Sequence, residues 1–98
     1  MTEAQIQRDI EQFLRLSGFL VYRMNSGKVR NNVRMNEKGT PDLLAVGLHR
    51  TLWIEVKTPE GRVSTDQKRM HERLEHRNQE ILIARSVEDV EDVIGRRD

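Results

Sequence analysis

The sequence contains no cysteine, which excludes disulfide bonds, thiolate zinc sites and cysteine nucleophiles. No apolar run approaches the roughly 18 residues of a membrane span, and the amino terminus has no apolar signal-peptide core. We therefore expect a soluble, intracellular protein, located in the cytoplasm. Its 98 residues are enough for one domain with a modest core, predicted to span residues 1–98.

An excess of charge of one sign is also missing, because 17 Lys and Arg residues face 16 Asp and Glu residues. The net charge of +1 gives no overall bias toward nucleic acid, so the distribution of charge matters more than its sum. The three histidines form no His-x-x-His or similar arrangement. Phosphate-binding glycine loops and serine nucleophile elbows are absent as well, which excludes these common catalytic sites.

Three segments have the pattern of amphipathic helices, expected over residues 2–16, 64–77 and 86–94. Apolar residues recur at helical spacing in each of them. Each helix also opens with a residue that favours the N-cap, and the first two have a glutamine three positions later, which forms a capping box. The capping residues are Thr2 with Gln5, Ser64 with Gln67, and Ser86.

Runs of β-forming residues predict four strands, over residues 19–24, 42–46, 51–57 and 80–84. The connection between the second and third strands is short enough for an antiparallel hairpin. Residues 25–39 show no sustained apolar period, which indicates a long loop or an irregular hairpin. The order α-β-β-β-α-β-α predicts an α/β fold with a small mixed sheet covered by helices.

Charged residues interrupt the two central predicted strands. Side chains alternate along a strand, so Glu55 and Lys57 share one face of the third strand, opposite Leu52, Ile54 and Val56. In an antiparallel pair, Asp42 at the start of the second strand comes close to Glu55. Two converging carboxylates repel each other unless a cation lies between them, and hard oxygen ligands suit Mg2+ or Mn2+.

Two polar helix residues are expected to point toward the same layer. In the first helix, Glu3 falls in the middle of the apolar stripe, whereas Asp9 and Glu11 fall outside it. In the second helix, Gln67 shares a face with His71 and its apolar neighbours. These two side chains would therefore lie near the strand carboxylates.

Each of these residues also has an ordinary interpretation. A Glu-x-Lys pair on a strand is usually a solvated ion pair, worth at most about 1 kcal/mol. Glu3 alone fits a first-turn acid favoured by the helix dipole, and Gln67 alone fits the capping partner of Ser64. Their convergence on one end of one sheet is what favours a functional site.

The segment before the second strand is locally basic and has the composition of a phosphate-binding surface. Its only acid is Glu37, and a merely solvated loop is the alternative. The candidate nucleic-acid-binding residues are Arg23, Asn25, Ser26, Lys28, Arg30, Arg34 and Lys38.

The motifs GTPDLLAV (39–46), LWIEVK (52–57) and RVSTDQ (62–67) resemble the PD-(D/E)XK nuclease superfamily. More narrowly, the chain resembles the VRR-NUC (virus-type replication-repair nuclease) branch, whose short phage members open with a helix like TEAQIQRDI. They continue with a segment similar to YRMNSGK (22–28). The resemblance covers roughly residues 2–94 and implies a restriction-endonuclease-like α-β-β-β-α-β core.

The resemblance also implies roles for residues of this chain. Asp42 and Glu55 match the metal ligands, with the Val56 carbonyl completing the protein's share of the Mg2+ or Mn2+ shell. Lys57 matches the lysine that positions or activates the attacking water and stabilises developing negative charge. Two helix residues complete the catalytic set: Glu3 matches the acid that orients water, and Gln67 matches the glutamine that supports the site.

The implied function is a metal-dependent, structure-specific DNA endonuclease that hydrolyses phosphodiester bonds. Stand-alone members of the branch resemble Holliday-junction resolvases, so we expect a homodimer acting on four-way junctions. The resemblance also implies a phage origin. Three alternatives remain open at this point. They are a flap or non-structure-specific nuclease, a non-catalytic nucleic-acid-binding module, and a structural protein whose charged strand is only solvated.

Overall fold

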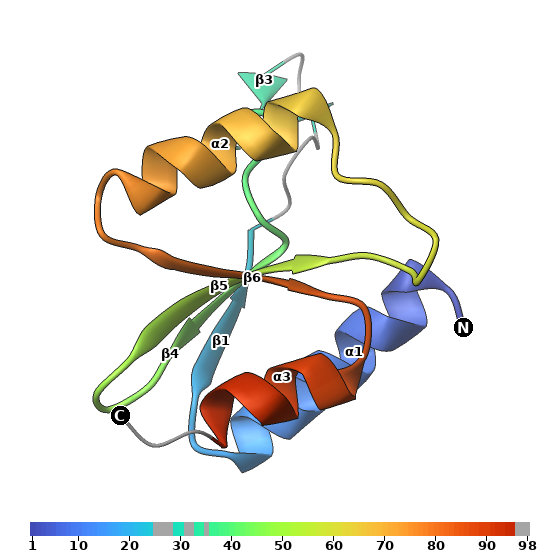
Figure 1. Ribbon diagram of the computed structural model, residues 1–98, viewed down its shortest axis with the longest axis vertical. Helices are drawn as coiled ribbons and strands as arrows, with labels where there is room; N and C mark the ends of the chain where they lie inside the picture. The colour runs from blue at the N-terminus through green and yellow to red at the C-terminus, as the bar shows by residue number, and fades with distance from the viewer. Residues whose placement is uncertain (25–28, 31–32, 35, 96–98) are drawn as a thin grey trace.

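A four-stranded mixed sheet separates α2 on one face from α1 and α3 on the other (Figure 1). The computed structural model describes residues 1–24, 29–30, 33–34 and 36–95. The helices are α1 (Glu3–Leu16), α2 (Thr65–Glu75) and α3 (Val87–Ile94). The sheet strands are β1 (Leu20–Arg23), β4 (Leu43–Val46), β5 (Thr51–Val56) and β6 (Glu80–Ala84). The predicted α/β fold is confirmed.

The sheet has the strand order β1-β4-β5-β6, with β1 and β6 at its edges. The pairs β1–β4 and β4–β5 are antiparallel, as the short connection predicted, whereas β5–β6 is parallel. A parallel neighbour requires a crossover connection, and α2 supplies it. Within residues 25–39, β2 (Val29–Arg30) pairs antiparallel with β3 (Val33–Arg34), so the hairpin interpretation is correct.

Local signals set the helix starts where the sequence placed them. Thr2 with Gln5 and Ser64 with Gln67 both form complete capping boxes, and the Ser86 side chain caps α3. The second helix ends at Glu75, two residues before the predicted end. Among the described residues, no helix is both long enough and apolar enough to cross a membrane.

The core lies between the sheet and the α1–α3 layer. The side chains of Leu52, Ile54 and Val56 are fully buried there, which confirms the predicted alternation along β5. The opposite face is covered less evenly, because α2 packs mainly over β6. Leu20 and Tyr22 of the edge strand β1 consequently remain 62% and 51% exposed.

Arg50, in the β4–β5 turn, binds the first residue of β6 and the last turn of α3. Its Nε and Nη2 donate to the Glu80 carboxylate at 2.8 and 2.6 Å, and its Nη1 donates to the Val93 carbonyl oxygen at 3.0 Å. The hydrogen bond from Arg50 lowers the pKa of Glu80. This bidentate geometry makes the pair a better anchor than most surface ion pairs.

We expect Arg50→Ala to lower the free energy of unfolding by about 1 kcal/mol at pH 7, since the pair is partly exposed. A lowered folded-state pKa stabilises above the ordinary glutamate value of 4.5, and that stabilisation is lost as the pH falls through the folded value. The difference between variant and parent in urea unfolding should therefore shrink at pH 3. An equal difference at both pH values would assign the effect to the Val93 contact instead.

Candidate active site

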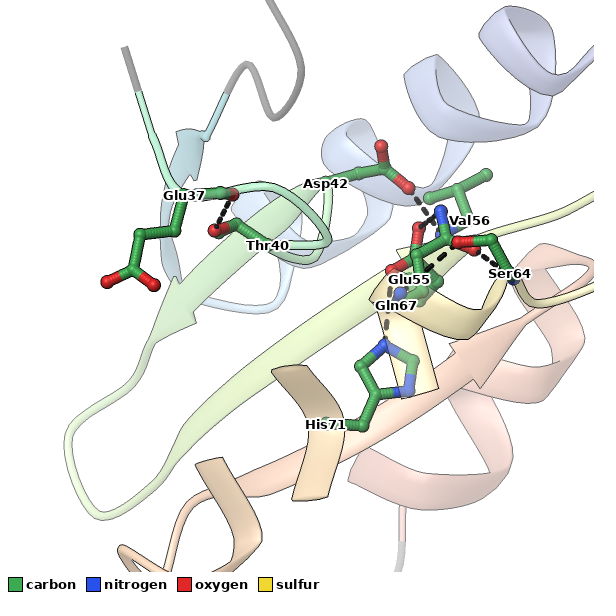
Figure 2. A network of polar contacts seen from close by, with 8 residues as sticks. All are labelled: Glu37, Thr40, Asp42, Glu55, Val56, Ser64, Gln67 and His71. Carbon is green, nitrogen blue, oxygen red and sulfur yellow. Dashed lines mark hydrogen bonds and ion pairs between the residues drawn. The ribbon is translucent and has the colours of Figure 1, made fainter. Parts of the chain in front are cut away.

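Asp42 and Glu55 meet where the β4–β5 pairing ends. Leu43 pairs with Ile54, so one further step along the antiparallel register places Asp42 opposite Glu55. The Asp42 carboxylate accepts a hydrogen bond from the Val56 N–H at 2.7 Å (Figure 2). The sequence therefore predicted the approach of the two acids correctly.

The carbonyl oxygen of Asp42 is held as well, because it accepts from the Met24 N–H at 2.9 Å. The residue before Asp42 is Pro41, which has no N–H to continue a strand ladder. Asp42 thus makes hydrogen bonds to the segments on both sides of it, at Met24 and at Val56. Its backbone is held at the end of β1 and its carboxylate at the end of β5.

Glu55 is enclosed by α2 and is only 1% exposed. Its Oε2 accepts from the Gln67 Nε2 at 3.2 Å, and its Oε1 lies 3.1 Å from the His71 Nε2 (Figure 2). Gln67 and His71 are four residues apart, so they lie on the same face of the helix. The carboxyl group is therefore held in one orientation from above the sheet.

Burial, followed by the hydrogen bond with the Asp42 carboxyl and the charge of that carboxyl, raises the pKa of Glu55 to about 9. Glu3 adds a smaller repulsion, and the Lys57 ammonium acts in the opposite direction. At neutral pH the Glu55 carboxyl is consequently protonated unless a cation joins the site. The site has more buried acidity than its own lysine neutralises.

His71 is the residue of this site that sequence reasoning left out. Burial lowers its pKa, with a contribution from Lys57, while the charge of Glu75 opposes the shift. Because the pKa of Glu55 is raised and that of His71 is lowered, their contact is a hydrogen bond between neutral groups rather than an ion pair. The available signal was its position one turn after Gln67 on the inward face.

Lys57 and Glu3 lie at the rim of the site. The backbone N–H of Lys57 donates to the Ala84 carbonyl oxygen at 3.0 Å, which extends the β5–β6 pairing and leaves the side chain partly buried. Glu3, in the first turn of α1, is exposed rather than covered by the sheet. Its charge nevertheless acts on Glu55, so both predicted residues lie within electrostatic range of that carboxyl.

Glu11 is buried although it falls outside the apolar stripe of α1. It is only 2% exposed. Arg23 from β1 and Arg15 from the next turn of α1 bind its carboxylate. Hydrophobic periodicity could not show this, because the burial depends on an arginine twelve residues away.

Comparison with known proteins adds the family. The model of the VRR-NUC domain matches residues 1–88. The chain belongs to the VRR-NUC family. A solved structure described as a VRR_NUC domain shares 22% sequence identity with it, at a TM-score of 0.77, and the match covers 98% of this chain and 97% of that chain. No curated protein matches the chain.

This membership makes the chain a nuclease of the PD-(D/E)XK type, and it confirms the resemblance seen in the sequence. The similar structure shows a shared fold. Such nucleases generally use divalent metals. Within residues 1–24 and 36–95, no three His, Asp or Glu side chains form a cluster that could hold an ion.

The donor set of this VRR-NUC domain nevertheless fits a hard divalent cation. Asp42 and Glu55 offer carboxylate oxygens where two adjacent strands meet, and burial together with the neighbouring Asp42 carboxyl raises the pKa of Glu55, an effect that a bound cation would oppose. Mg2+ in particular keeps several waters and needs only one or two protein carboxylates. Two acids with a backbone carbonyl such as that of Val56 are therefore a sufficient protein share.

The candidate DNA contacts of the VRR-NUC domain are only partly described. Arg23 binds Glu11, and the Lys38 Nζ lies 3.1 Å from the Asp66 carboxylate on α2. Both side chains stay largely exposed, at 58% and 67%, so these ion pairs leave the predicted DNA contacts untested. The remaining predicted contacts lie outside the described residues or side chains: Asn25, Ser26, Lys28, Arg30 and Arg34.

Proposed function

We propose that this VRR-NUC domain is a metal-dependent, structure-specific DNA endonuclease that cuts four-way junctions as a homodimer. The observation that carries the proposal is the pair formed by the buried Glu55 and the partly buried Asp42, whose acidity calls for a cation, beside the ammonium group of Lys57. Phosphodiester hydrolysis needs both a cation and a positioned charge at the phosphate.

Asp42, Glu55 and the Val56 carbonyl would hold Mg2+ or Mn2+. The ion, when bound, supplies neutralisation of phosphate charge and lowers the pKa of water. Lys57 places a further positive charge beside the scissile phosphate and positions the attacking water. These groups come from the rigid ends of two paired strands, so their relative geometry is set before DNA binds.

Gln67 and Glu3 have supporting roles in this proposal. Gln67 fixes the orientation of the Glu55 carboxyl through its 3.2 Å hydrogen bond. Glu3 extends from the start of α1, where an exposed carboxylate accepts hydrogen bonds from water entering the site. Neither residue needs to contact DNA for its contribution.

Homodimer formation follows from the junction as substrate, because each chain offers one site and a four-way junction requires two symmetric cuts. The sheet face beside α2 supports a partner there, since Leu20 and Tyr22 of the edge strand are more than half exposed. A two-fold contact would bury the same residues on both copies. Their burial would remove an apolar surface from water.

The proposal is tested by cleavage of four-way junction, flap and linear duplex DNA in Mg2+, Mn2+ and EDTA. We expect metal-dependent cutting with the junction preferred. Lys57→Ala should reduce cleavage by roughly 10²–10³-fold, the usual cost of removing one charge-stabilising group, while junction binding in EDTA persists. Lys68→Ala, which removes an exposed lysine from α2, serves as the control for loss of one positive charge.

Three results would contradict the proposal in different ways. Wild-type cleavage by Lys57→Ala would refute the assigned site. Equal cutting of all three substrates would leave a nuclease without structure preference. Binding without cleavage under every metal condition would favour a non-catalytic nucleic-acid-binding module.

A further inference from the structure

A buried acidic anchor lies on α1, away from the Asp42–Glu55 pair. Both oxygens of Glu11 accept hydrogen bonds from the Arg23 Nε, at 3.1 and 2.9 Å. The Arg15 Nη1 and the Gln7 Nε2 donate to the same carboxylate, each at 3.2 Å. Burying a carboxylate is costly unless it is paired, and here three side chains compensate the charge of Glu11.

The geometry of Arg23 leaves most of its guanidinium group available. Only its Nε bonds to Glu11, and its Nη1 and Nη2 make no hydrogen bond to a described residue. The side chain is 58% exposed, whereas Glu11 is 2% exposed. Glu11 thus holds the base of the guanidinium group while its outer N–H donors face solvent, an arrangement suited to a phosphate.

A groove on the surface of α1 contains this arginine. It has a volume of about 300 Å³ and is lined by Ala4, Gln7, Arg8, Glu11 and Arg23. Arg8 is exposed and forms no ion pair with any described residue, so it adds an uncompensated positive charge. Since Glu11 is already paired, the groove as a whole is positive.

Two residues that line the groove are sequence neighbours of residues at the proposed active site. Ala4 follows Glu3 on α1, and Glu3 acts electrostatically on Glu55. Arg23 precedes Met24, whose N–H donates to the Asp42 carbonyl oxygen at 2.9 Å. A DNA strand entering the site would therefore pass this groove.

We propose that the groove binds a backbone phosphate of the DNA strand next to the scissile bond. Arg8 and Arg23 donate to the phosphate oxygens, and Glu11 is the positioning residue that orients Arg23. The inference rests on the proposed function for the identity of its ligand as DNA. It does not depend on cleavage, because phosphate binding in the groove needs no metal.

The test measures binding of fluorescein-labelled four-way junction and linear duplex DNA in EDTA, over a series of salt concentrations. Arg23→Ala should weaken binding by about 10-fold, as expected for a lost charge-assisted hydrogen bond. The slope of log affinity against log salt should fall by about 0.9, the value for one phosphate contact. Arg8→Ala should behave in the same direction.

Arg15→Ala is the matched control. Arg15 also binds Glu11 and is 53% exposed, but it does not line the groove. Its removal lowers the net charge by the same amount as removal of Arg23, so a nearly unchanged affinity and salt slope are expected. Equal losses for Arg15→Ala and Arg23→Ala would overturn the proposal, because they would show a response to net charge alone.

Glu11→Gln tests the positioning role by whether DNA binding becomes weaker or stronger. Removing a negative charge from a DNA-binding surface would strengthen binding if only overall electrostatics mattered. A positioning role predicts weaker binding, because Arg23 loses its charged anchor. Tighter binding by a folded Glu11→Gln protein would overturn the role of Glu11. If that variant does not fold, the exposed Arg8, Arg15 and Arg23 variants still decide whether the groove binds DNA.

The same measurements separate this inference from the proposed function. Loss of binding in the arginine variants of a protein that never cleaves would support the groove and refute the nuclease assignment. Metal-dependent junction cleavage with unchanged binding in Arg8→Ala and Arg23→Ala would support the nuclease assignment and refute the groove as a phosphate-binding site.

Discussion

Replacing Glu55 by glutamine is expected to reduce cleavage strongly while making the metal-free protein more stable than the parent at alkaline pH. Burial and Asp42 raise the pKa of Glu55 to about 9, so the folded, metal-free chain favours a neutral side chain there. Glutamine has the same shape without the charge. It retains an oxygen for the Gln67 amide but loses the carboxylate that a cation requires.

The direction of the pH dependence follows from proton linkage. A folded-state pKa raised above the ordinary 4.5 gives stability that is fully present below pH 4.5. That stability declines as the pH rises toward about 9, because folding then holds a proton that the unfolded chain releases. Urea unfolding in EDTA at pH 5, 7 and 8.5 should show this decline in the parent but not in Glu55→Gln.

Adding Mn2+ should restore the stability of the parent at high pH, because an ion that binds only the folded state stabilises it. The same addition should leave Glu55→Gln nearly unchanged. Cleavage by this variant should fall on the order of 10³-fold. Glu60→Gln, a change at an exposed glutamate, is the control and should match the parent in all three measurements.

Two outcomes would contradict the assignment of Glu55. One is a Glu55→Gln protein that cuts DNA at the parental rate. The other is a pH dependence that persists in the variant, which would place the responsible group elsewhere.

Replacing Gly39 by alanine is expected to be the most destabilising single-methyl change in the described chain segments around the site. Gly39 has a φ of +87°, and an added Cβ would lie 2.3 Å from the Asp66 carbonyl oxygen and 3.0 Å from the Gln67 nitrogen. Both contacts are to the backbone of α2, which cannot move aside without shifting the helix. Strain and overpacking together suggest a loss of about 3 kcal/mol or more.

Gly18→Ala separates the two causes. Gly18 also has a positive φ, of +95°, but an added Cβ there meets nothing within 4 Å. Its cost should be only the conformational one, about 1–2 kcal/mol. Thermal melts should therefore rank Gly39→Ala well below Gly18→Ala, at roughly 4–8 °C per kcal/mol for a domain of this size. Similar melting temperatures would refute the steric account.

The effect of Gly39→Ala should extend to catalysis. Hydrogen bonds hold the residues around Gly39 in place, since the Thr40 Oγ1 donates to the Glu37 carbonyl oxygen at 2.7 Å (Figure 2). The Glu37 carboxylate accepts from the Arg73 Nη1 at 2.6 Å. This segment leads directly into Asp42, so a displaced Gly39 moves a proposed ligand. Gly18→Ala, at the far end of α1, should leave cleavage nearly unchanged at a temperature where both variants are folded.

The sequence predicted what local rules determine. Capping boxes at Thr2 and Ser64 fixed the starts of two helices, because the signal lies within four residues. Alternation along residues 51–57 placed Glu55 opposite the core face, and the short turn gave the antiparallel register that brings Asp42 to it. The convergence of these two acids with Gln67 was therefore predictable.

What the sequence could not show depends on contacts between distant segments. The burial of Glu11 requires Arg23 from another element, so a count of helical spacing placed it outside. The pairing of Lys38 with Asp66 likewise joins residues that the chain order separates. The Glu55–His71 contact was hidden because a histidine on an inward helix face is compatible with plain packing.

Gln67 gives the site a fixed polarity. Its Oε1 accepts from the Ser64 N–H at 2.8 Å as part of the capping box, so the amide cannot turn over without opening the first turn of α2. Its Nε2 must therefore face Glu55, so the Glu55 atom at that position has to accept a hydrogen bond. The beginning of a helix thus determines which end of an amide the Glu55 carboxyl meets. Asparagine would be too short to serve both partners, and glutamate would keep the cap but turn an oxygen toward another oxygen.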